Sequence, residues 1–317
     1  MMSEPDNRTN ESIVVVQPST AVELEIALRL DELCRANNGS GALNAAARAD
    51  LQLPGPHSTA VIAYGPTADP VGLAQMAPNA NFRSPHFAAS VVAVPTAPAD
   101  ILTSLMRGLV DACKADGGGH IVCWIDEATD HTNRLARDAG FEVERVQHRM
   151  SAGLPVDATA ALPTGTTFRS FVPDQDEEVW LEVNNSAFGN HPDQGDWTEA
   201  NLVARMGEEW FDPEGFLLAF DNRGLGGFCW TKVHNIDDDQ NRLGEIFVIG
   251  VEPTREGTGL ARALVINGLR YLARVQGCDR GMLHVDAANK RALKLYKSLG
   301  FGIDYSARAY GIEVSTP

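Results

Sequence analysis

Two glycines near residue 258 stand where a chain could bind phosphate. A β-branched run ending at Val251 leads through Pro253 to Gly257 and Gly259, and an apolar helix is predicted to begin at Leu260. Glycine lets a diphosphate approach main-chain N–H groups at a helix N-terminus, where unpaired donors and the helix dipole favour negative charge. The segment predicts a pyrophosphate-binding loop that works without a lysine.

Other glycine-rich phosphate sites fit this segment less well. No Lys-Ser or Lys-Thr pair follows the glycines, as a P-loop requires, and the spacing differs from the dinucleotide-binding fingerprint. An ordinary strand-to-helix turn is the alternative that these residues alone leave open.

The chain after residue 281 is predicted to form a strand, a loop, a helix and a strand. Met282 to Asp286 has the pattern of a short strand, a helix begins near Asn289, Gly300 ends it, and a last strand covers Ile303 to Tyr310. Together with the glycine segment, this order resembles the GCN5-related N-acetyltransferase (GNAT) family. The resemblance implies an α/β fold with a mixed sheet, and acetyl-CoA bound between two parallel strands that splay apart.

The resemblance also implies which residues contact acetyl-CoA. By position they form three stretches: Ile249, Gly250 and Val251; Glu256, Gly257, Thr258, Gly259, Leu260, Ala261 and Arg262; and Asn289, Lys290, Arg291, Ala292, Leu293 and Lys294. Glu256 departs from the family, which usually has Arg or Gln there. Either Glu256 points away while Arg255 or Arg262 serves the phosphates, or the affinity for acetyl-CoA is lower. Asn289 is a helix N-cap, a cofactor contact, or both.

A base and an acid are sought near this loop, because acetyl transfer to an amine moves two protons. Glu245 lies in an otherwise apolar strand leading to the glycines, and we expect burial to raise its pKa and suit it as the base. A solvent-facing position on an alternating strand is the alternative. The leucines near Tyr296 indicate a core residue, whereas the resemblance implies that Tyr296 is the general acid toward the CoA sulfur.

Direct attack of the amine on the thioester is expected, with a backbone N–H of residues 249–251 polarising the carbonyl. No nucleophilic cysteine with a base beside it is visible in the sequence. Cys229, in the strand on the acceptor side, is the cysteine to check for an acetyl-enzyme.

The acceptor is suggested by residues 184–198, which are dense in amides, carboxylates, His and Trp and would suit sugar hydroxyls and an ammonium. This stretch resembles a tandem-domain branch of the GNAT family that acetylates the cysteinyl amine of desacetylmycothiol, a cysteine joined to glucosaminyl-inositol. The resemblance implies that Asp193, Lys232, Glu245 and His284 contact the acceptor. From the residues alone, a surface turn for Asp193 and a solvated lysine for Lys232 are alternatives.

The chain reads as two similar halves. Residues 151–167 are rich in Ala, Pro, Gly and Thr, so we expect an N-terminal acetyltransferase-like domain over 1–155 and a catalytic domain over 156–317. A shift of 160 residues places 122–126 on 282–286, Gly140-Phe141 on Gly300-Phe301 and Met150 on Tyr310.

The first half has lost the residues that the chemistry needs. A shift of 158 residues places Pro98 on Glu256, Ala99 on Gly257, Ile101 on Gly259 and Thr103 on Ala261, while Ala136 lies opposite Tyr296 under the shift of 160. Proline has no N–H to offer, and a β-branched side chain would obstruct a phosphate. We expect this half to be catalytically inactive and to bind acetyl-CoA poorly or not at all.

Composition narrows the class of protein. The chain has 317 residues, a formal charge of −16 and 44% hydrophobic residues. This charge disfavours nucleic acid and anionic membranes as partners, and neither a signal pattern nor a long apolar run is visible, so a cytoplasmic monomer is expected. Five scattered cysteines support neither zinc nor a disulfide framework. His191 and His234 lack partners at ligand spacing, so no metal is expected.

Three functions remain open at this point. The first is acetylation of desacetylmycothiol, and the second is acetylation of another small amine or a protein N-terminus. The third is a non-catalytic CoA-binding protein, against which the retention of both Glu245 and Tyr296 argues.

Overall fold

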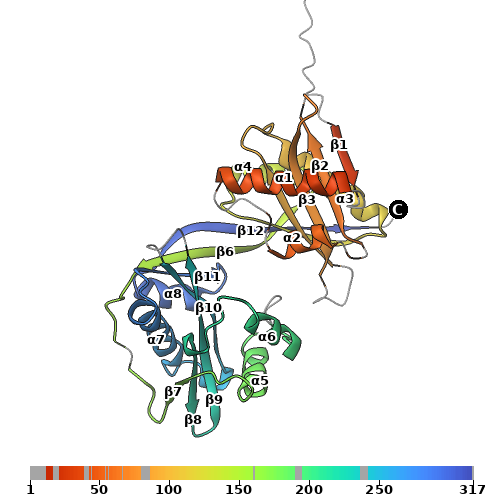
Figure 1. Cartoon of the computed structure of the whole chain (residues 1–317). Helices are drawn as coiled ribbons and strands as arrows, with labels where there is room; N and C mark the ends of the chain where they lie inside the picture. The colour runs from red at the N-terminus through yellow and green to blue at the C-terminus, as the bar shows by residue number, and fades with distance from the viewer. Residues whose placement is uncertain are drawn as a thin grey trace, which may run out of the picture. The chain divides into compact units, whose positions relative to one another are not determined.

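The computed structural model of the chain describes residues 12–16, 21–38, 43, 45–53, 55, 57–65, 67–79, 86–159, 161–189, 195–235 and 242–315. The chain divides into two compact units, one made of Met1–Val146 with Ser306–Pro317 and the other of Gln147–Tyr305 (Figure 1). Each unit is a mixed β-sheet with helices packed on it, which confirms the α/β class predicted from the sequence.

The first unit has its strands in the order β1-β2-β3-β4-β5-β12, where β12 is Gly302–Val314, and they are antiparallel except for β4 beside β5. Its core is built by apolar side chains of α3 and of the sheet, and Leu105, Leu109 and Met76 belong to this buried cluster. Its elements are β1 (Ser12–Val16), α1 (Ala21–Asn38), α2 (Ala45–Gln52), β2 (Thr59–Tyr64), β3 (Pro70–Pro78), β4 (His86–Ala93), α3 (Ile101–Ala115), β5 (Gly119–Ile125) and α4 (Asp130–Asp138).

The second unit has the strand order β6-β11-β10-β9-β8-β7, in which only β10 and β11 are parallel. Helices α7 and α8 cover one face of the sheet and α5 and α6 the other (Figure 1). The elements that lie wholly in this unit are β7 (Thr167–Ser170), α5 (Glu177–Ala187), α6 (Glu199–Met206), η1 (Pro213–Gly215), β8 (Phe216–Asp221), β9 (Gly224–Asn235), β10 (Arg242–Val251), η2 (Pro253–Arg255), α7 (Leu260–Arg274), β11 (Arg280–Asp286) and α8 (Lys290–Ser298). Strands β6 (Glu142–Gly153) and β12 (Gly302–Val314) each contribute residues to both units.

Strand β12 completes the sheet of the first unit. It pairs antiparallel with β5, and Tyr310 lies opposite Cys123. In the second unit, the corresponding place beside β11 is taken by residues 147–153 of β6, with Met150 opposite Leu283. These two pairs are related by the 160-residue repeat, so the two halves have exchanged their last strands.

Because of this exchange, the boundaries of the units differ from the single domain boundary at 155/156 that the linker composition predicts. The units divide at 146/147 and again at 305/306. The described residues from Leu154 to Thr166 form neither helix nor strand, as the linker composition predicts. Composition shows where the chain is a loop, but it does not show which sheet a later strand joins.

Two glycines allow α7 to lie close to the sheet. A Cβ on Gly268 would lie 2.6 Å from the Cys229 sulfur and 2.9 Å from Ile246 Cδ1. A Cβ on Gly244 would lie 2.8 Å from a methyl group of Leu272. Because such contacts are too short for real atoms, larger residues would push the helix off the sheet.

The opposite face of the second unit is held by aromatic packing. Trp230 stacks on Phe216 with ring centroids 4.3 Å apart, and Trp180 meets Trp230 edge to face at 5.9 Å. Edge-to-face and stacked rings both suit the aromatic quadrupole, and large rings bury much apolar area. This layer supports the strands that carry the polar residues of the site.

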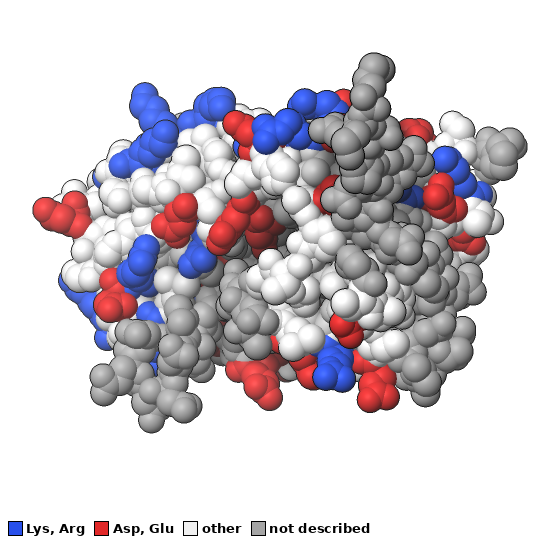
Figure 2. All heavy atoms as spheres, turned by 90° about the horizontal axis from the view of Figure 1, so that it is seen from above, with Lys and Arg blue, Asp and Glu red and all other residues white. Residues whose placement is uncertain are grey.

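No helix among the described residues is long and apolar enough to cross a membrane. Within the same residues, no group of three or more His, Cys, Asp or Glu side chains is arranged to hold a metal ion. All five cysteines are free and buried. The face seen in Figure 2 carries acidic and basic side chains interspersed with one another.

Candidate functional site

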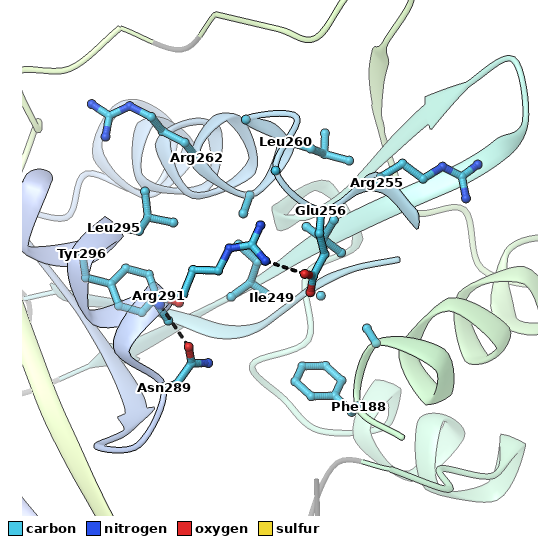
Figure 3. A pocket seen from close by; sticks show the side chains of 17 residues that line it. Phe188, Ile249, Arg255, Glu256, Leu260, Arg262, Asn289, Arg291, Leu295 and Tyr296 are labelled. Atoms are coloured by element: carbon cyan, nitrogen blue, oxygen red, sulfur yellow. Dashed lines mark hydrogen bonds and ion pairs between the residues drawn. The ribbon is translucent and has the colours of Figure 1, made fainter. Parts of the chain in front are cut away.

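A pocket of about 410 Å³ lies where β10 ends, between the first turns of α7 and α8 (Figure 3). The β10–β11 pairing runs only from Leu243 opposite Arg280 to Ile246 opposite Leu283, and the parallel strands separate beyond it. Most residues predicted to contact acetyl-CoA line this pocket, together with Tyr296 and Phe188. The lining comprises Ala187, Phe188, Ile249, Gly250, Val251, Arg255, Glu256, Gly257, Gly259, Leu260, Ala261, Arg262, Asn289, Arg291, Ala292, Leu295 and Tyr296.

Four of the residues predicted to contact acetyl-CoA do not line the pocket. The Thr258 hydroxyl donates to the Arg255 carbonyl at 2.7 Å, and Lys290 Nζ donates to the Ala287 carbonyl at 2.6 Å. Leu293 is buried in the core under α8, and Lys294 is exposed. The helical period explains this, because only one side of each first turn can face the pocket.

The glycine loop has the backbone that phosphate binding needs. Gly257 has φ of 78° and Gly259, the N-cap of α7, has φ of 92°, both in the left-handed region. A Cβ added to either residue would meet no atom within 4 Å, so it would point into open space. The loop therefore fits a diphosphate. Because Gly257 and Gly259 have no side chains, the diphosphate can reach the N–H groups of the first turn of α7.

Glu256 does not face the pocket as an isolated charge. It forms an ion pair with Arg291, which reaches across the pocket from the first turn of α8 (Figure 3). Both side chains are more than half exposed. Arg291 is thus a cation inside the pocket whose charge Glu256 already engages.

The other two arginines near the loop, Arg255 and Arg262, also line the pocket, but they bind side chains that do not line it. Arg255 is 9% exposed and pairs with Asp221 at 3.1 Å and with Glu252 at 2.9 Å. Its hydrogen bonds hold the pKa of the Asp221 carboxyl well below the ordinary value. Arg262 donates to the Ser298 hydroxyl at 2.8 Å. Arg255 therefore braces the loop, and Arg291 is the arginine best placed for a phosphate.

Tyr296 is both a core residue and a pocket residue. It is 5% exposed, packs with Phe301 at a centroid distance of 6.0 Å, and lines the pocket. Burial, with a smaller effect from the neighbouring Cys229, raises the pKa of the Tyr296 phenol above its ordinary value. The phenol therefore keeps its proton at neutral pH and remains a donor.

Glu245 is buried, but its acidity differs from the expectation. Burial alone would raise its pKa, yet hydrogen bonds from His234 at 2.7 Å and His284 at 3.4 Å more than offset this and lower the pKa to about 2. The expectation of a raised pKa was wrong because the two partners come from other strands, which the local sequence does not reveal. Glu245 is ionised at neutral pH.

Three of the four predicted acceptor residues, Lys232, Glu245 and His284, lie on one face of the sheet. Lys232 lies opposite Glu245 in the β9–β10 pairing, and its Nζ is 4.5 Å from the Trp210 ring centroid. A polar pocket of about 490 Å³ adjoins Lys232, Trp210 and Asp212. His284 joins Glu245 on this face, whereas Asp193 lies outside the described residues. A cation over an aromatic ring beside a carboxylate suits a polar, amine-bearing ligand.

Sequence reasoning missed two features of the site. The sequence suggests His234 only as a possible metal ligand. The antiparallel register of β9 and β10, which the sequence does not reveal, brings His234 close to Glu245. Phe188, at the end of α5, lines the pocket from the opposite side (Figure 3). It was seen only as part of a polar stretch, because its role depends on tertiary packing.

Comparison with known proteins decides the family. Residues 178–301 match the model of the acetyltransferase (GNAT) family. A protein named Mycothiol acetyltransferase from Acidimicrobium ferrooxidans is 41% identical over 212 residues, which cover 65% of this chain and 68% of that protein. The chain belongs to the GNAT acetyltransferase family. This confirms the resemblance drawn from the glycine segment and from residues 282–310.

Other relatives of this GNAT protein carry the same name. The Mycothiol acetyltransferase of Salinispora arenicola is 44% identical over 198 residues, covering 62% of this chain and 64% of that protein. That of Paenarthrobacter aurescens is 43% identical over 197 residues, covering 61% of each. The chain thus spans just under two thirds of the length of these two relatives.

Solved structures extend the GNAT likeness over both units. A GCN5-related N-acetyltransferase from Sphaerobacter thermophilus has a TM-score of 0.68 at 21% identity, covering 99% of this chain and 98% of that one. A tandem GNAT protein from the clavulanic acid biosynthesis pathway has a TM-score of 0.66 at 14% identity, covering 97% of this chain and all of that one. At these identities the likeness supports the fold alone.

The pairing of Glu256 with Arg291 leads to a binding prediction. Glu256→Gln is expected to tighten acetyl-CoA binding by up to about five-fold at low salt, since an exposed ion pair is worth about 0–1 kcal/mol and its loss frees Arg291. Arg291→Gln should weaken binding and reduce its salt dependence. Calorimetry at two salt concentrations measures both effects, with Arg274→Gln, in the last turn of α7, as the control. Equal or weaker binding by Glu256→Gln would contradict the assignment.

Proposed function

We propose that this protein transfers the acetyl group of acetyl-CoA to the cysteinyl amine of desacetylmycothiol, giving mycothiol. Two findings support the proposal. Relatives above 40% identity are named Mycothiol acetyltransferase, and the second unit has both a glycine-lined pocket and a face that carries Lys232, Glu245 and His284. The proposal depends most on the left-handed backbone conformation of Gly257 and Gly259 at the N-terminus of α7.

Bound acetyl-CoA would supply an acetyl thioester whose carbonyl carbon the amine attacks. The first turn of α7 would hold its diphosphate, and a backbone N–H of residues 249–251 would polarise the carbonyl. The basic centre around Glu245 would remove the proton of the amine. Tyr296, whose phenol stays protonated, would donate a proton to the departing thiolate.

A direct transfer is favoured over an acetyl-enzyme by the state of Cys229. This cysteine has no exposed surface, and burial raises its pKa to about 12. The thiolate is the nucleophilic form of cysteine, and it is scarcely populated at neutral pH when the pKa is so high. Cys229 therefore lacks both the charge and the access that a nucleophile needs.

The first unit is proposed to play no catalytic part. Ile101, at the position equivalent to Gly259, is 6% exposed and begins α3 as a core residue. Ala136, equivalent to Tyr296, is fully buried and has no hydroxyl. We propose that the complete protein acts as a cytoplasmic monomer with one competent site per chain.

The choice of acceptor tests the function. The protein is expected to release CoA from acetyl-CoA much faster with cysteinyl-glucosaminyl-inositol than with free cysteine or glucosamine, because only the full acceptor can use the polar face beyond Lys232. Thiol release would be followed continuously, and the product mass would identify the acetylated amine. Equal rates with simple amines would favour a broader amine acetyltransferase, and CoA binding without turnover a non-catalytic role.

A further inference from the structure

Both oxygens of the Glu245 carboxylate are already engaged. His234 Nε2 lies 2.7 Å from Oε2, and His284 Nδ1 lies 3.4 Å from Oε1. An ionised carboxylate can only accept, so the ring nitrogen facing it must carry the hydrogen in each histidine. The other nitrogen of a neutral ring, Nε2 in His284 and Nδ1 in His234, then holds a free lone pair. The accessible basic atoms of this cluster are therefore imidazole nitrogens.

Exposure agrees with that assignment. The Glu245 side chain is 9% exposed, whereas those of His234 and His284 are 33% and 36% exposed. The two rings are therefore more accessible to a ligand than the carboxylate is. A buried carboxylate behind an exposed imidazole is the arrangement that orients a histidine base in other enzymes.

The strand register distinguishes the two histidines. His234 lies opposite Leu243, two positions before Glu245 and away from the pocket. Leu283 lies opposite Ile246, which places His284 beyond Glu245 in the direction of Ile249. At about 3.3 Å per residue, the backbone of His284 lies roughly 13 Å nearer than the backbone of His234 to the pocket end of the sheet. Both side chains extend toward Glu245, so their rings lie closer together than their backbones do.

The charged groups around this ring come from three strands and the start of β12. Lys232 of β9 lies opposite Glu245, and Arg149 of β6 lies opposite His284. Arg149 Nε is in turn 3.6 Å from an Asp304 oxygen. His284 therefore sits between positive and negative groups at the edge of the acceptor face.

We propose that His284 accepts the proton of the acceptor's amine and that Glu245, held by His234, is a positioning residue that fixes the ring's tautomer. This rests on the proposed function. As the C–N bond forms and the C–S bond breaks, the amine proton passes to His284 Nε2 and the Tyr296 phenol proton passes to the thiolate. Solvent then removes the proton from His284 and restores the one on Tyr296, so the cycle balances.

Kinetics of matched variants tests this role. His284→Gln is expected to lower kcat by about 100-fold or more, with the acetyl-CoA KM unchanged, and His234→Gln to have a smaller effect. The dependence of kcat on pH should differ between the wild type and His284→Gln, while the limb that comes from the acceptor's own ammonium persists in both. Added imidazole should restore part of the activity of His284→Ala. His131→Gln, on the first unit, is the control.

A spectroscopic measurement tests the proposal without turnover. In ¹⁵N-histidine NMR of the full chain, neutral His284 is expected to carry its proton on Nδ1, and Glu245→Gln should shift the tautomer toward Nε2–H. A proton on Nε2 in the wild type, or an unchanged kcat and pH profile in His284→Gln, would overturn the role of His284. Absence of acetyl transfer by the wild type would instead contradict the proposed function, and the tautomer would still decide the role of His284.

Discussion

Glu245→Gln is expected to lower kcat by about 10²–10⁴-fold, because the histidine base that Glu245 orients would lose its contribution to general acid–base catalysis. Glutamine keeps the shape of the side chain but removes the charge that orients both histidines. It can also donate where the carboxylate only accepted, which disturbs the tautomer of His284. Pre-steady-state and steady-state rates of CoA release at saturating substrates would measure the effect.

Acetyl-CoA binding separates a catalytic effect from a folding defect in this variant. Glu245 does not line the pocket, so the dissociation constant of Glu245→Gln should match that of the wild type. Glu182→Gln, an exposed change on α5, is the matched control for removing one negative charge. If Glu245→Gln kept the wild-type kcat, the carboxylate would be excluded both as the base and as the group that orients the histidines.

The acidity of Glu245 also gives a stability prediction. Its pKa in the folded chain is about 2, below the ordinary 4.5. Ionised Glu245 therefore stabilises the fold above about pH 4.5, and this contribution is lost as the pH falls toward 2. The difference in unfolding free energy between the wild type and Glu245→Gln should be largest near neutrality and should narrow in acid, as denaturant titrations at several pH values would show.

Gly259→Val is expected to weaken acetyl-CoA binding by about 100-fold, which is about 2.7 kcal/mol. The branched side chain would occupy the space through which the diphosphate reaches the N–H groups of α7, and hydrogen bonds to a charged group are worth about 1.5–3 kcal/mol each. Calorimetry with acetyl-CoA and with CoA would measure the loss.

Backbone strain is the competing explanation for this second prediction, and a matched glycine controls for it. Gly277 also has a left-handed φ, 70°, and a Cβ there would meet no atom within 4 Å, but it lies after α7 and outside the pocket. Gly277→Val should share the strain and the fall in melting temperature while binding acetyl-CoA normally. Equal loss of affinity in both variants would contradict the proposal that the glycine loop binds the diphosphate.

Local signals in the sequence predicted the parts of the site that depend on nearby residues. Asn289 caps α8, since its side chain accepts from Ala292 N at 3.0 Å, and α7 begins at Leu260 as expected. Glycines, caps and apolar periodicity act within a few residues, so they are readable from one chain.

Pairings between distant segments were not readable in the same way. The partners of Glu245 come from positions 11 and 39 residues away, and that of Glu256 from 35 residues away. Each depends on strand register or on how two helices meet at the pocket. The lowered pKa of Glu245 followed from those partners, which is why burial alone gave the opposite direction.

The exchanged last strands have a consequence for biosynthesis. A chain emerging from the ribosome cannot complete its first sheet when the first half has been made, because the strand beside β5 is β12. That sheet keeps an unpaired edge until about 160 more residues have been translated. Partly synthesised chains should therefore need protection from edge-to-edge association, and truncation before Ser306 should destabilise the first unit before the second.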